Sequence, residues 1–299
     1  MNNVLVIGSL NFDETYHVSK MPKCGETVSA KKVETFCGGK GANQAYASAQ
    51  AGAKTTMIGS IGNDEEGTII INKLKSVGVD TSYIQRLHHE RTGKAIISVD
   101  ENGENSIIVY PGANYSSNFE SVFLKAIGEA DIVLIQNEIR REVVEKMIYL
   151  SAKLGKIVIY NPAPFYSISP LILRMVNYLT PNEHELRDIV PNKSSTEERI
   201  KYLLDIGVGN IIVTLGSEGA QLFNNKENIK VAAPKVNAIN TVGAGDCFNG
   251  TFAAILGNDT LTKALQTAVY AASLSTTTNG AMESMQTLEI VNKLMEEER

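Results

Sequence analysis

Short apolar runs recur along the chain, and each is followed by a turn and then by a helical pattern. The runs are rich in Ile and Val without polar alternation, which is typical of strands buried on both faces. Helical periodicity is clearest at Arg141–Leu154 and Thr196–Ile206. This alternation predicts an α/β fold with a mostly parallel central sheet covered by helices on both faces. The expected strands are Val4–Ile7, Thr56–Ile58, Ile132–Ile135, Ile157–Tyr160, Tyr178–Thr180 and Ile211–Thr214.

Two segments break this alternation. In the first, Glu14–Phe36, strand-like composition occurs at Tyr16–Val18 and Thr27–Val33 with no helix between them. In the second, Thr92–Tyr110, two β-rich runs flank Asn102-Gly103, which is a strong hairpin signal. We interpret the two segments as one small antiparallel sheet beside the main domain, with unrelated surface hairpins as the alternative. The runs of the second segment are Lys94–Val99 and Ser106–Tyr110.

The length of the chain allows this organisation. With 299 residues, it can form one large core and a small appended sheet. We expect residues 1–13, 37–91 and 111–299 to form the main domain, and residues 14–36 and 92–110 to form the small sheet.

Charge and cysteine content exclude several classes of protein. The net charge of −5 argues against nucleic-acid binding through a basic face. The three cysteines have no CxxC spacing, so we expect reduced thiols rather than disulfides or a zinc site. The first apolar run ends at Gly8-Ser9, too early for a signal peptide, and no window is long enough for a membrane span. We therefore expect a soluble cytoplasmic protein.

Polar residues follow the expected strands directly. Ile132–Ile135 is followed by Gln136-Asn137-Glu138, and Tyr178–Thr180 by Pro181-Asn182-Glu183-His184-Glu185. Because the carboxyl ends of parallel strands face one crevice, these groups should converge there. Carboxylates and carboxamides suit a hydroxyl-rich ligand, since each can engage a sugar hydroxyl.

A glycine-rich stretch, Cys37-Gly38-Gly39-Lys40-Gly41, precedes one expected helix. Paired glycines let the backbone approach a ligand that a Cβ would keep away. Lys40 adds a cation, and Asn43 lies in the first helical turn. The stretch is not a Walker A sequence, because the required glycine spacing and the Lys-Ser/Thr pair are absent.

A second stretch, Gly243-Ala244-Gly245-Asp246, opens another expected helix. A turn of this kind offers free N–H groups and the positive end of the helix dipole to an anion. Asp246 could simply cap the helix. The alternative is a catalytic base, because phosphoryl transfer needs both neutralisation of charge and a group that orients or deprotonates the nucleophile.

Taken together and in order, these motifs resemble the ribokinase (PfkB-type) family of sugar kinases over essentially the whole chain. The presence of a lysine in the early glycine motif resembles ribokinases in particular. The resemblance implies a ribokinase-like three-layer α/β/α domain with a small β lid, which in ribokinases also forms a homodimer contact. The motifs are Gly8–Asp13, Gly38–Ala45, Asn161–Pro164, Thr180–Glu185, Thr214–Gly219 and Gly243–Asp246.

The resemblance also implies a role for each candidate residue. ATP would donate its γ-phosphoryl to the 5-hydroxyl of D-ribose, with Asp246 as base and Glu185 near Mg²⁺ through water. A kinase of deoxyribose, another sugar or a nucleoside is the alternative, and a sugar or nucleotide sensor without turnover is another. The implied sugar contacts are Asn11, Asp13, Gly39, Lys40, Asn43 and Glu138; the ATP contacts are Asn182, Thr214, Gly216 and Gly219; the anion hole is Gly243, Ala244 and Gly245.

One position departs from the family pattern. Ribokinases usually have an acidic residue where this chain has Asn240, and that residue helps to bind an activating monovalent cation, normally K⁺. Loss of a negative charge should weaken cation binding. The other residues implied for this site are Val242, Ser275, Gly280 and Ser284.

Overall fold

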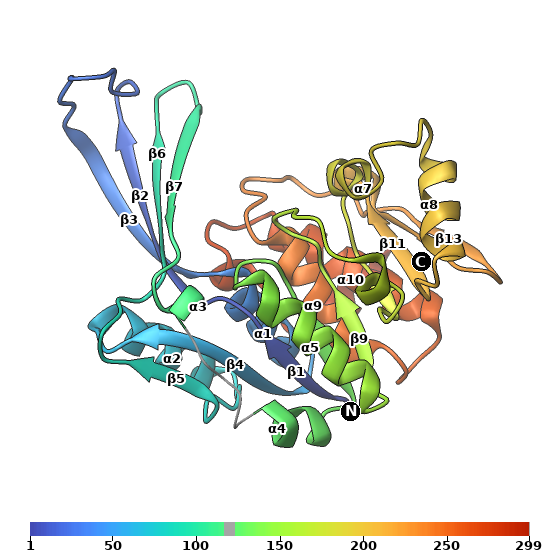
Figure 1. Ribbon diagram of the computed structural model, residues 1–299. Helices are drawn as coiled ribbons and strands as arrows, with labels where there is room; N and C mark the ends of the chain where they lie inside the picture. Colours follow the sequence, from blue (N-terminus) through green and yellow to red (C-terminus); the bar gives the residue numbers. More distant parts are fainter. Residues whose placement is uncertain (117–122, 299) are drawn as a thin grey trace.

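The computed structural model describes residues 1–116 and 123–298. Its core is a nine-stranded sheet in the order β13-β12-β11-β10-β9-β8-β1-β4-β5 (Figure 1). Pairing is parallel from β5 through β11 and antiparallel for β11–β12 and β12–β13. The strands are β1 (Asn3–Ile7), β4 (Lys54–Gly62), β5 (Ile84–Leu87), β8 (Ile132–Ile135), β9 (Ile157–Tyr160), β10 (Tyr178–Leu179), β11 (Asn210–Thr214), β12 (Ala220–Phe223) and β13 (Asn228–Val231).

Helices cover both faces of this sheet, which confirms the expected three layers. Successive residues of β1 point to opposite faces: Val6 belongs to the core under α1 and α9, whereas Leu5 and Ile7 belong to the core under α5. The first face carries α1 (Lys40–Gln50), α2 (Glu65–Ser76), α9 (Ala244–Ile255), α10 (Leu261–Ser275) and α11 (Leu288–Glu297). The second carries α4 (Phe123–Glu129), α5 (Arg141–Lys153), α6 (Pro170–Leu173), α7 (Glu183–Ile189) and α8 (Thr196–Asp205), and the short α3 (Ala113–Ser116) follows the small sheet.

All the strands expected from buried apolar runs are present. The strands that the sequence did not indicate are β5, β12 and β13, which lie toward the two edges of the sheet. β12 alternates between buried and partly exposed residues, and β5 and β13 include exposed residues, so all three lack the continuous apolar run that marks a central strand.

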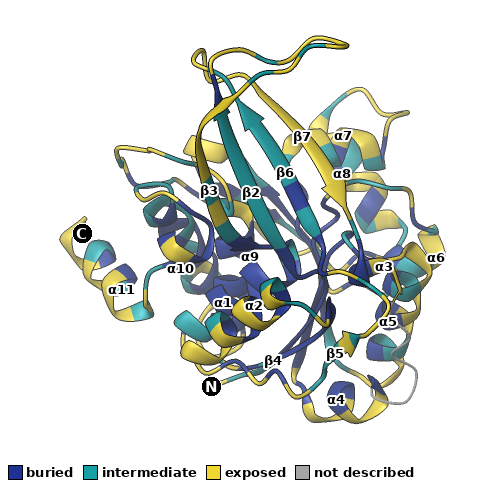
Figure 2. Cartoon of the chain, turned by 90° about the vertical axis from the view of Figure 1, so that its left-hand side faces the viewer, coloured by how far each residue is buried: buried dark blue, intermediate teal, exposed yellow. Residues whose placement is uncertain are grey.

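The two segments that broke the alternation do share one small sheet, in the order β3-β2-β6-β7. Its outer pairs, β2–β3 and β6–β7, are antiparallel, and the central pair β2–β6 is parallel. The sheet stands away from the main domain (Figure 1), and the outer strand β7 is exposed along its length (Figure 2). The strands are β2 (Asn11–Val18), β3 (Ala30–Gly38), β6 (Lys94–Val99) and β7 (Asn105–Tyr110).

The strands of the first segment differ from the expected ones in their bounds. The segment Thr27–Val33 was expected to be a strand, but β3 begins only at Ala30 and continues to Gly38. Similarly, β2 begins at Asn11 rather than at Tyr16. Polar residues such as Asp13 and Glu14 hide these strand ends in the sequence. The two ends bring Asn11 and Gly38 to the top of the main sheet, where they are paired with each other.

Within the described part of the chain, no helix has the length and apolar character needed to cross a bilayer. Cys24, Cys37 and Cys247 are free thiols, as expected.

Candidate active site

Glycines on α1 and α9 bring the two glycine-rich stretches together. A Cβ on Gly41 would lie 2.6 Å from the carbonyl carbon of Gly8 at the end of β1. A Cβ on Gly250 would lie 2.4 Å from the backbone oxygen of Gln44 in α1. Real Cβ atoms do not approach other atoms so closely, so only glycine permits these contacts. The beginning of α1 is therefore held against both the main sheet and α9.

Asp246 lies in the first turn of α9 and points toward α1. Its side chain is 6% exposed, and both carboxylate oxygens accept hydrogen bonds. Asn43 Nδ2 donates to Oδ2 at 2.9 Å, and Gln44 Nε2 donates to Oδ1 at 3.0 Å. The cap of α9 is Gly243, which has no side-chain capping bond. Asp246 is therefore not the helix cap, and its carboxylate is bonded to α1 instead.

Burial raises the pKa of Asp246 above the usual aspartate value, because the ionised form loses water. Lys40 and the two amide donors act in the opposite direction and favour the carboxylate. The pKa of Lys40 is in turn raised, mainly by the charge of Asp246 and to a smaller extent by Glu138 and Glu185, which keeps its ammonium charged. The site thus contains a lysine cation enclosed by carboxylates from different elements.

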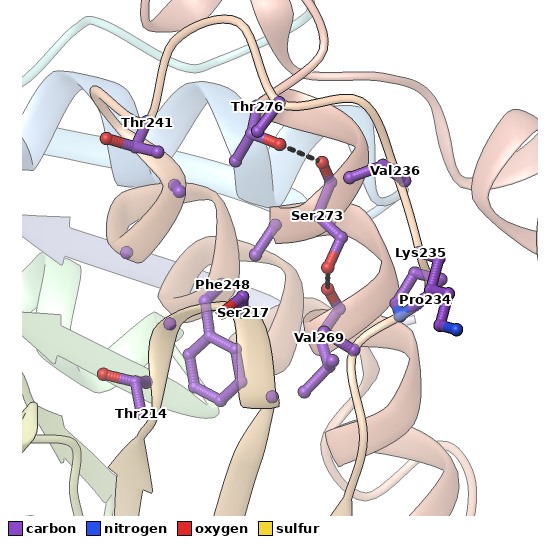
Figure 3. Close-up of a pocket in the computed structure, with 17 residues that line it drawn as sticks. Thr214, Ser217, Pro234, Lys235, Val236, Thr241, Phe248, Val269, Ser273 and Thr276 are labelled. Carbon is purple, nitrogen blue, oxygen red and sulfur yellow. Dashed lines mark hydrogen bonds between the residues drawn. The ribbon is translucent and has the colours of Figure 1, made fainter.

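A cavity of about 520 Å³ lies between β11, α9 and α10 (Figure 3). Gly243 has φ of 79°, a left-handed conformation that permits the sharp entry into α9. Ala244 and Gly245 line the cavity, as do Thr214, Gly216 and Gly219 from the far side. The structure therefore brings together the expected anion-binding turn and the expected nucleotide contacts.

Other residues of this cavity carried no sequence signal. The irregular segment after β13 contributes Pro234, Lys235 and Val236, α10 contributes Ser273, and the residue that follows α10 contributes Thr276 (Figure 3). Because the lining is mostly apolar and comes from a loop and a helix flank, no short motif marks it. Asn182, which was expected at the nucleotide, is not among the lining residues and instead pairs with Thr214 in an isolated β-bridge.

Asn182 and Glu185 form a capping box at the start of α7. Glu185 N donates to Asn182 Oδ1 at 2.8 Å, and Asn182 N donates to Glu185 Oε2 at 2.9 Å. Burial raises the pKa of Glu185, while Lys40 favours its ionised form. Glu185 therefore presents a carboxylate within electrostatic range of Lys40 and Asp246.

The implied sugar contacts lie where the small sheet meets the main sheet. Glu138 Oε2 accepts from Ser9 Oγ at 2.6 Å and from Lys40 N at 2.9 Å, which joins the ends of β8, β1 and α1. Asp13 Oδ1 accepts from Ala95 N at 3.1 Å. Burial raises the pKa of Asp13 to about 7, and Glu138 adds to the rise.

One polar atom of the Asn43 side chain has no hydrogen-bond partner among the described residues. Its Nδ2 is used by Asp246, whereas its Oδ1 is buried and has no hydrogen-bond partner within residues 1–116 and 123–298. A buried acceptor without a partner is costly, so a donor from a ligand hydroxyl would relieve it. Asn11 is oriented by Asn114, whose Nδ2 donates to Asn11 Oδ1 at 2.8 Å. Asn114 was not expected from the sequence, because it lies in a short helix without a motif.

The residues implied for a monovalent cation lie in two neighbouring segments. Asn240 N donates to Thr276 O at 3.0 Å, and a Cβ on Gly243 would lie 3.0 Å from Ala281 Cβ. Asn240 Oδ1 accepts from Val242 N at 2.9 Å. The Ser275 and Ser284 hydroxyls donate to carbonyls one turn earlier, and Gly280 has φ of 92°. Within the described ranges, no cluster of at least three His, Cys, Asp or Glu side chains could hold a metal ion.

Comparison with known proteins decides the family. The model of the pfkB family carbohydrate kinases matches residues 1–288. The chain belongs to this family. It is 37% identical to a ribokinase of Bacillus subtilis, over 99% of this chain and 100% of that protein. It is 33% identical to a deoxyribokinase of Salmonella typhi, over 98% of each chain.

Solved structures of the pfkB family agree with this assignment. The Arabidopsis thaliana ribokinase solved with ribose and ATP superposes with a TM-score of 0.93, at 32% identity and over 98% of each chain. The protein described here is therefore a sugar phosphotransferase with the ribokinase fold. The large parallel sheet with its helices and the small four-stranded sheet are features of that fold.

Proposed function

We propose that this protein transfers the γ-phosphoryl group of ATP to the 5-hydroxyl of D-ribose. The observation that carries the proposal is the position of Asp246. Its carboxylate shares a helical turn with Ala244 and Gly245, which line the large cavity, and it is bonded to Asn43, whose free acceptor suits a sugar hydroxyl. A phosphate in the cavity and a hydroxyl beside Asn43 would therefore meet at Asp246.

The sugar would lie under the lid. Asn11, Asp13 and Glu138 offer polar atoms to its hydroxyls, the Gly39 backbone allows close approach, and Lys40 adds a cation. Asp246 would accept the proton of the attacking hydroxyl as the O–P bond forms. Closure of the small sheet would exclude water, which otherwise competes as the nucleophile.

The anion hole and Mg²⁺ would each neutralise part of the negative charge of the phosphates. The N–H groups of Gly243, Ala244 and Gly245 would bind the transferred phosphoryl oxygens at the start of α9, where the Ala244 N–H donates to Thr241 O at 3.3 Å. Glu185 is a carboxylate of the kind that holds Mg²⁺ through water, and a Mg²⁺ kept mainly by phosphates and water needs no larger protein cluster. When bound, Mg²⁺ would neutralise charge on the phosphates. Asn182 would act by fixing Glu185 through the capping box.

A monovalent cation, K⁺ in related enzymes, would bind between the Asn240–Val242 segment and the loop containing Gly280 and Ser284. Carbonyl and hydroxyl oxygens are the donors that this region offers. Asn240 Oδ1 already accepts a backbone hydrogen bond and has no negative charge, so the affinity should be low.

The substrate assignment rests on relatives. A related ribokinase is 37% identical to this chain, and a deoxyribokinase at 33% identity makes deoxyribose the second candidate. The test is ADP release measured with ribose, deoxyribose, other sugars and nucleosides, with Mg²⁺ and K⁺ present. We expect the highest kcat/KM with ribose and Asp246-dependent turnover. A clear preference for deoxyribose or a nucleoside would refute the ribose assignment, and ATP or ribose binding without turnover would support a sensor instead.

The lid also suggests a homodimer. Ile107, Ile108, Val109 and Tyr110 on the edge strand β7 are 46–66% exposed, which is unusual for four consecutive large apolar residues. Pairing of two lids would bury them. We expect a dimer by light scattering and a monomer for Ile108→Glu; a native monomer would refute this proposal.

A further inference from the structure

Gln44 is a buried amide at the centre of the site for which the proposed chemistry has no role so far. It is fully buried in α1, one residue after Asn43. Its Nε2 donates to Asp246 Oδ1 at 3.0 Å and to Asn161 Oδ1 at 3.1 Å. Its Oε1 accepts from Gln136 Nε2 at 2.5 Å. Each polar atom of this side chain is therefore used.

The neighbours of Gln44 determine which way its amide faces. Asn161 Nδ2 donates to the backbone oxygen of Thr180 at 3.1 Å, and a backbone oxygen can only accept. Asn161 must therefore turn its Oδ1 toward Gln44, which in turn must present N–H groups to Asn161 and to Asp246. Gln136, directly after β8, is consistent with this orientation because it donates to the opposite end of Gln44.

The same chain of amides reaches the anion-binding turn. Thr180 Oγ1 donates to Asn249 Oδ1 at 2.6 Å, and Asn249 Nδ2 donates to the backbone oxygen of Gly245 at 2.8 Å. Asp246 is thus connected to the ends of β8, β9 and β10 by Gln44, and its own turn is connected to them by Asn249. Because Gln136, Asn161 and Thr180 are buried directly at these strand ends, they can fix both the carboxylate and the turn.

We propose that Gln44 is a positioning residue that holds Asp246 in the rotamer and protonation state needed for phosphoryl transfer. This inference rests on the proposed role of Asp246 as base. Asn43 holds the other carboxylate oxygen but also carries the buried Oδ1 proposed for a sugar hydroxyl, so a substitution there would affect both roles. The Gln44 side chain bonds to Asp246, Asn161 and Gln136, none of which is an implied sugar contact.

Charged groups face Asp246 from several elements. Lys40 on α1 stabilises its ionised form, and Glu138 after β8 opposes it. Glu185 on α7 is also within electrostatic range. A substitution at Gln44 leaves these three charged residues in place. A change in the pKa of Asp246 in such a variant would therefore come from the loss of the Gln44 amide.

The test is the pH dependence of kcat for Gln44→Met, measured with saturating sugar and ATP. Burial raises the pKa of Asp13, in the implied sugar site, to about 7. Saturation with sugar therefore keeps a pH-dependent KM out of the kcat profile. Loss of one hydrogen bond to the carboxylate should move the acid limb of the profile upward by about one to two pH units. At high pH we expect kcat to remain about tenfold or more below native, with little change in the KM for sugar, because the carboxylate is less well oriented.

Ser48→Ala is the matched control. Ser48 is fully buried on α1, one turn after Gln44, and its Oγ accepts from Thr55 Oγ1 at 3.1 Å. This variant loses a buried hydrogen bond without touching Asp246, so its stability should fall while its acid limb stays native. Gln44→Glu provides a second probe: a carboxylate beside Asp246 should also raise the acid limb, through repulsion of like charges.

The outcomes separate this proposal from the function on which it depends. An inactive native protein would refute the proposed function. An active, Asp246-dependent native protein, combined with a native acid limb in whichever Gln44 variant folds, would refute the positioning role alone. A shift in the Gln44 variants but not in Ser48→Ala supports it.

Discussion

Replacement of Asp246 by Asn separates catalysis from folding more sharply than any other change in this site. The substitution keeps the size of the side chain and removes its ability to accept a proton. General-base catalysis typically contributes about 10²–10⁴-fold, so kcat should fall by that factor. The Gln44 bond to Oδ1 can remain. Asn43 can turn its amide, because its Oδ1 has no other partner among the described residues.

Whereas kcat should fall, the stability of the Asp246→Asn variant should rise or remain unchanged. Burial is the largest cause of the raised pKa of Asp246. A carboxyl group whose pKa is higher in the folded state stabilises folding fully below its unfolded pKa, and this contribution is lost as pH rises through the folded pKa. Above that folded pKa the ionised Asp246 therefore costs stability, apart from its attraction to Lys40, and Asn removes that cost.

The assay is ADP release with saturating ATP and ribose, combined with a thermal melt of the unliganded protein and titrations of both ligands. We expect a large loss of kcat, nearly native affinities and a Tm equal to or above the native value. Near-native turnover would exclude Asp246 as the base. A Tm several degrees lower would show that the carboxylate serves the fold, and that the loss of activity has another origin.

Three further changes test neighbouring parts of the site. The KM for sugar should fall as pH rises through about 7, where Asp13 ionises and becomes a better acceptor, and Asp13→Asn should abolish this dependence; a native KM that is flat from pH 6 to 8 would contradict it. Gly41→Ala should destabilise the fold by about 1–3 kcal/mol in denaturant unfolding, since its Cβ would lie 2.6 Å from backbone, whereas Gly128→Ala, with open space around it, should not. Asn240→Asp should lower the K⁺ concentration that gives half-maximal activation, and an ordinary K⁺ response in the native protein would show that the missing charge is unimportant.

Much of the fold was predictable because buried parallel strands have a strong signature. β8 and β9 are continuous apolar runs, and their bounds match the prediction. β5 and β13 could not be found in the same way, since an edge strand needs few buried side chains. The small sheet was found from Asn102-Gly103 and from the missing helix, but β3 was placed several residues early because it is mostly exposed.

The candidate site was predictable where function requires an unusual backbone. Gly243 and the glycines before α1 stand out because turns and close approaches exclude a Cβ. Asn114 and Gln44 do not stand out, because an amide within a helical pattern is ordinary until its partners are known. Those partners lie about a hundred or more residues away in the chain, so only the folded structure reveals them. The same holds for Lys235 and Ser273 at the large cavity.

The contacts between α1, α9 and β1 explain how the site can be accurate although its residues come from distant segments. Gly41 rests on the end of β1, and Gly250 lets α9 rest on the backbone of α1 at Gln44. Backbone contacts of this kind leave no room for adjustment, unlike contacts between flexible side chains. Lys40 and Asp246 thereby lie on two helices whose separation is set by glycine. A methyl group at either glycine should therefore alter catalysis through the distance between these helices, even though neither glycine touches the reacting groups.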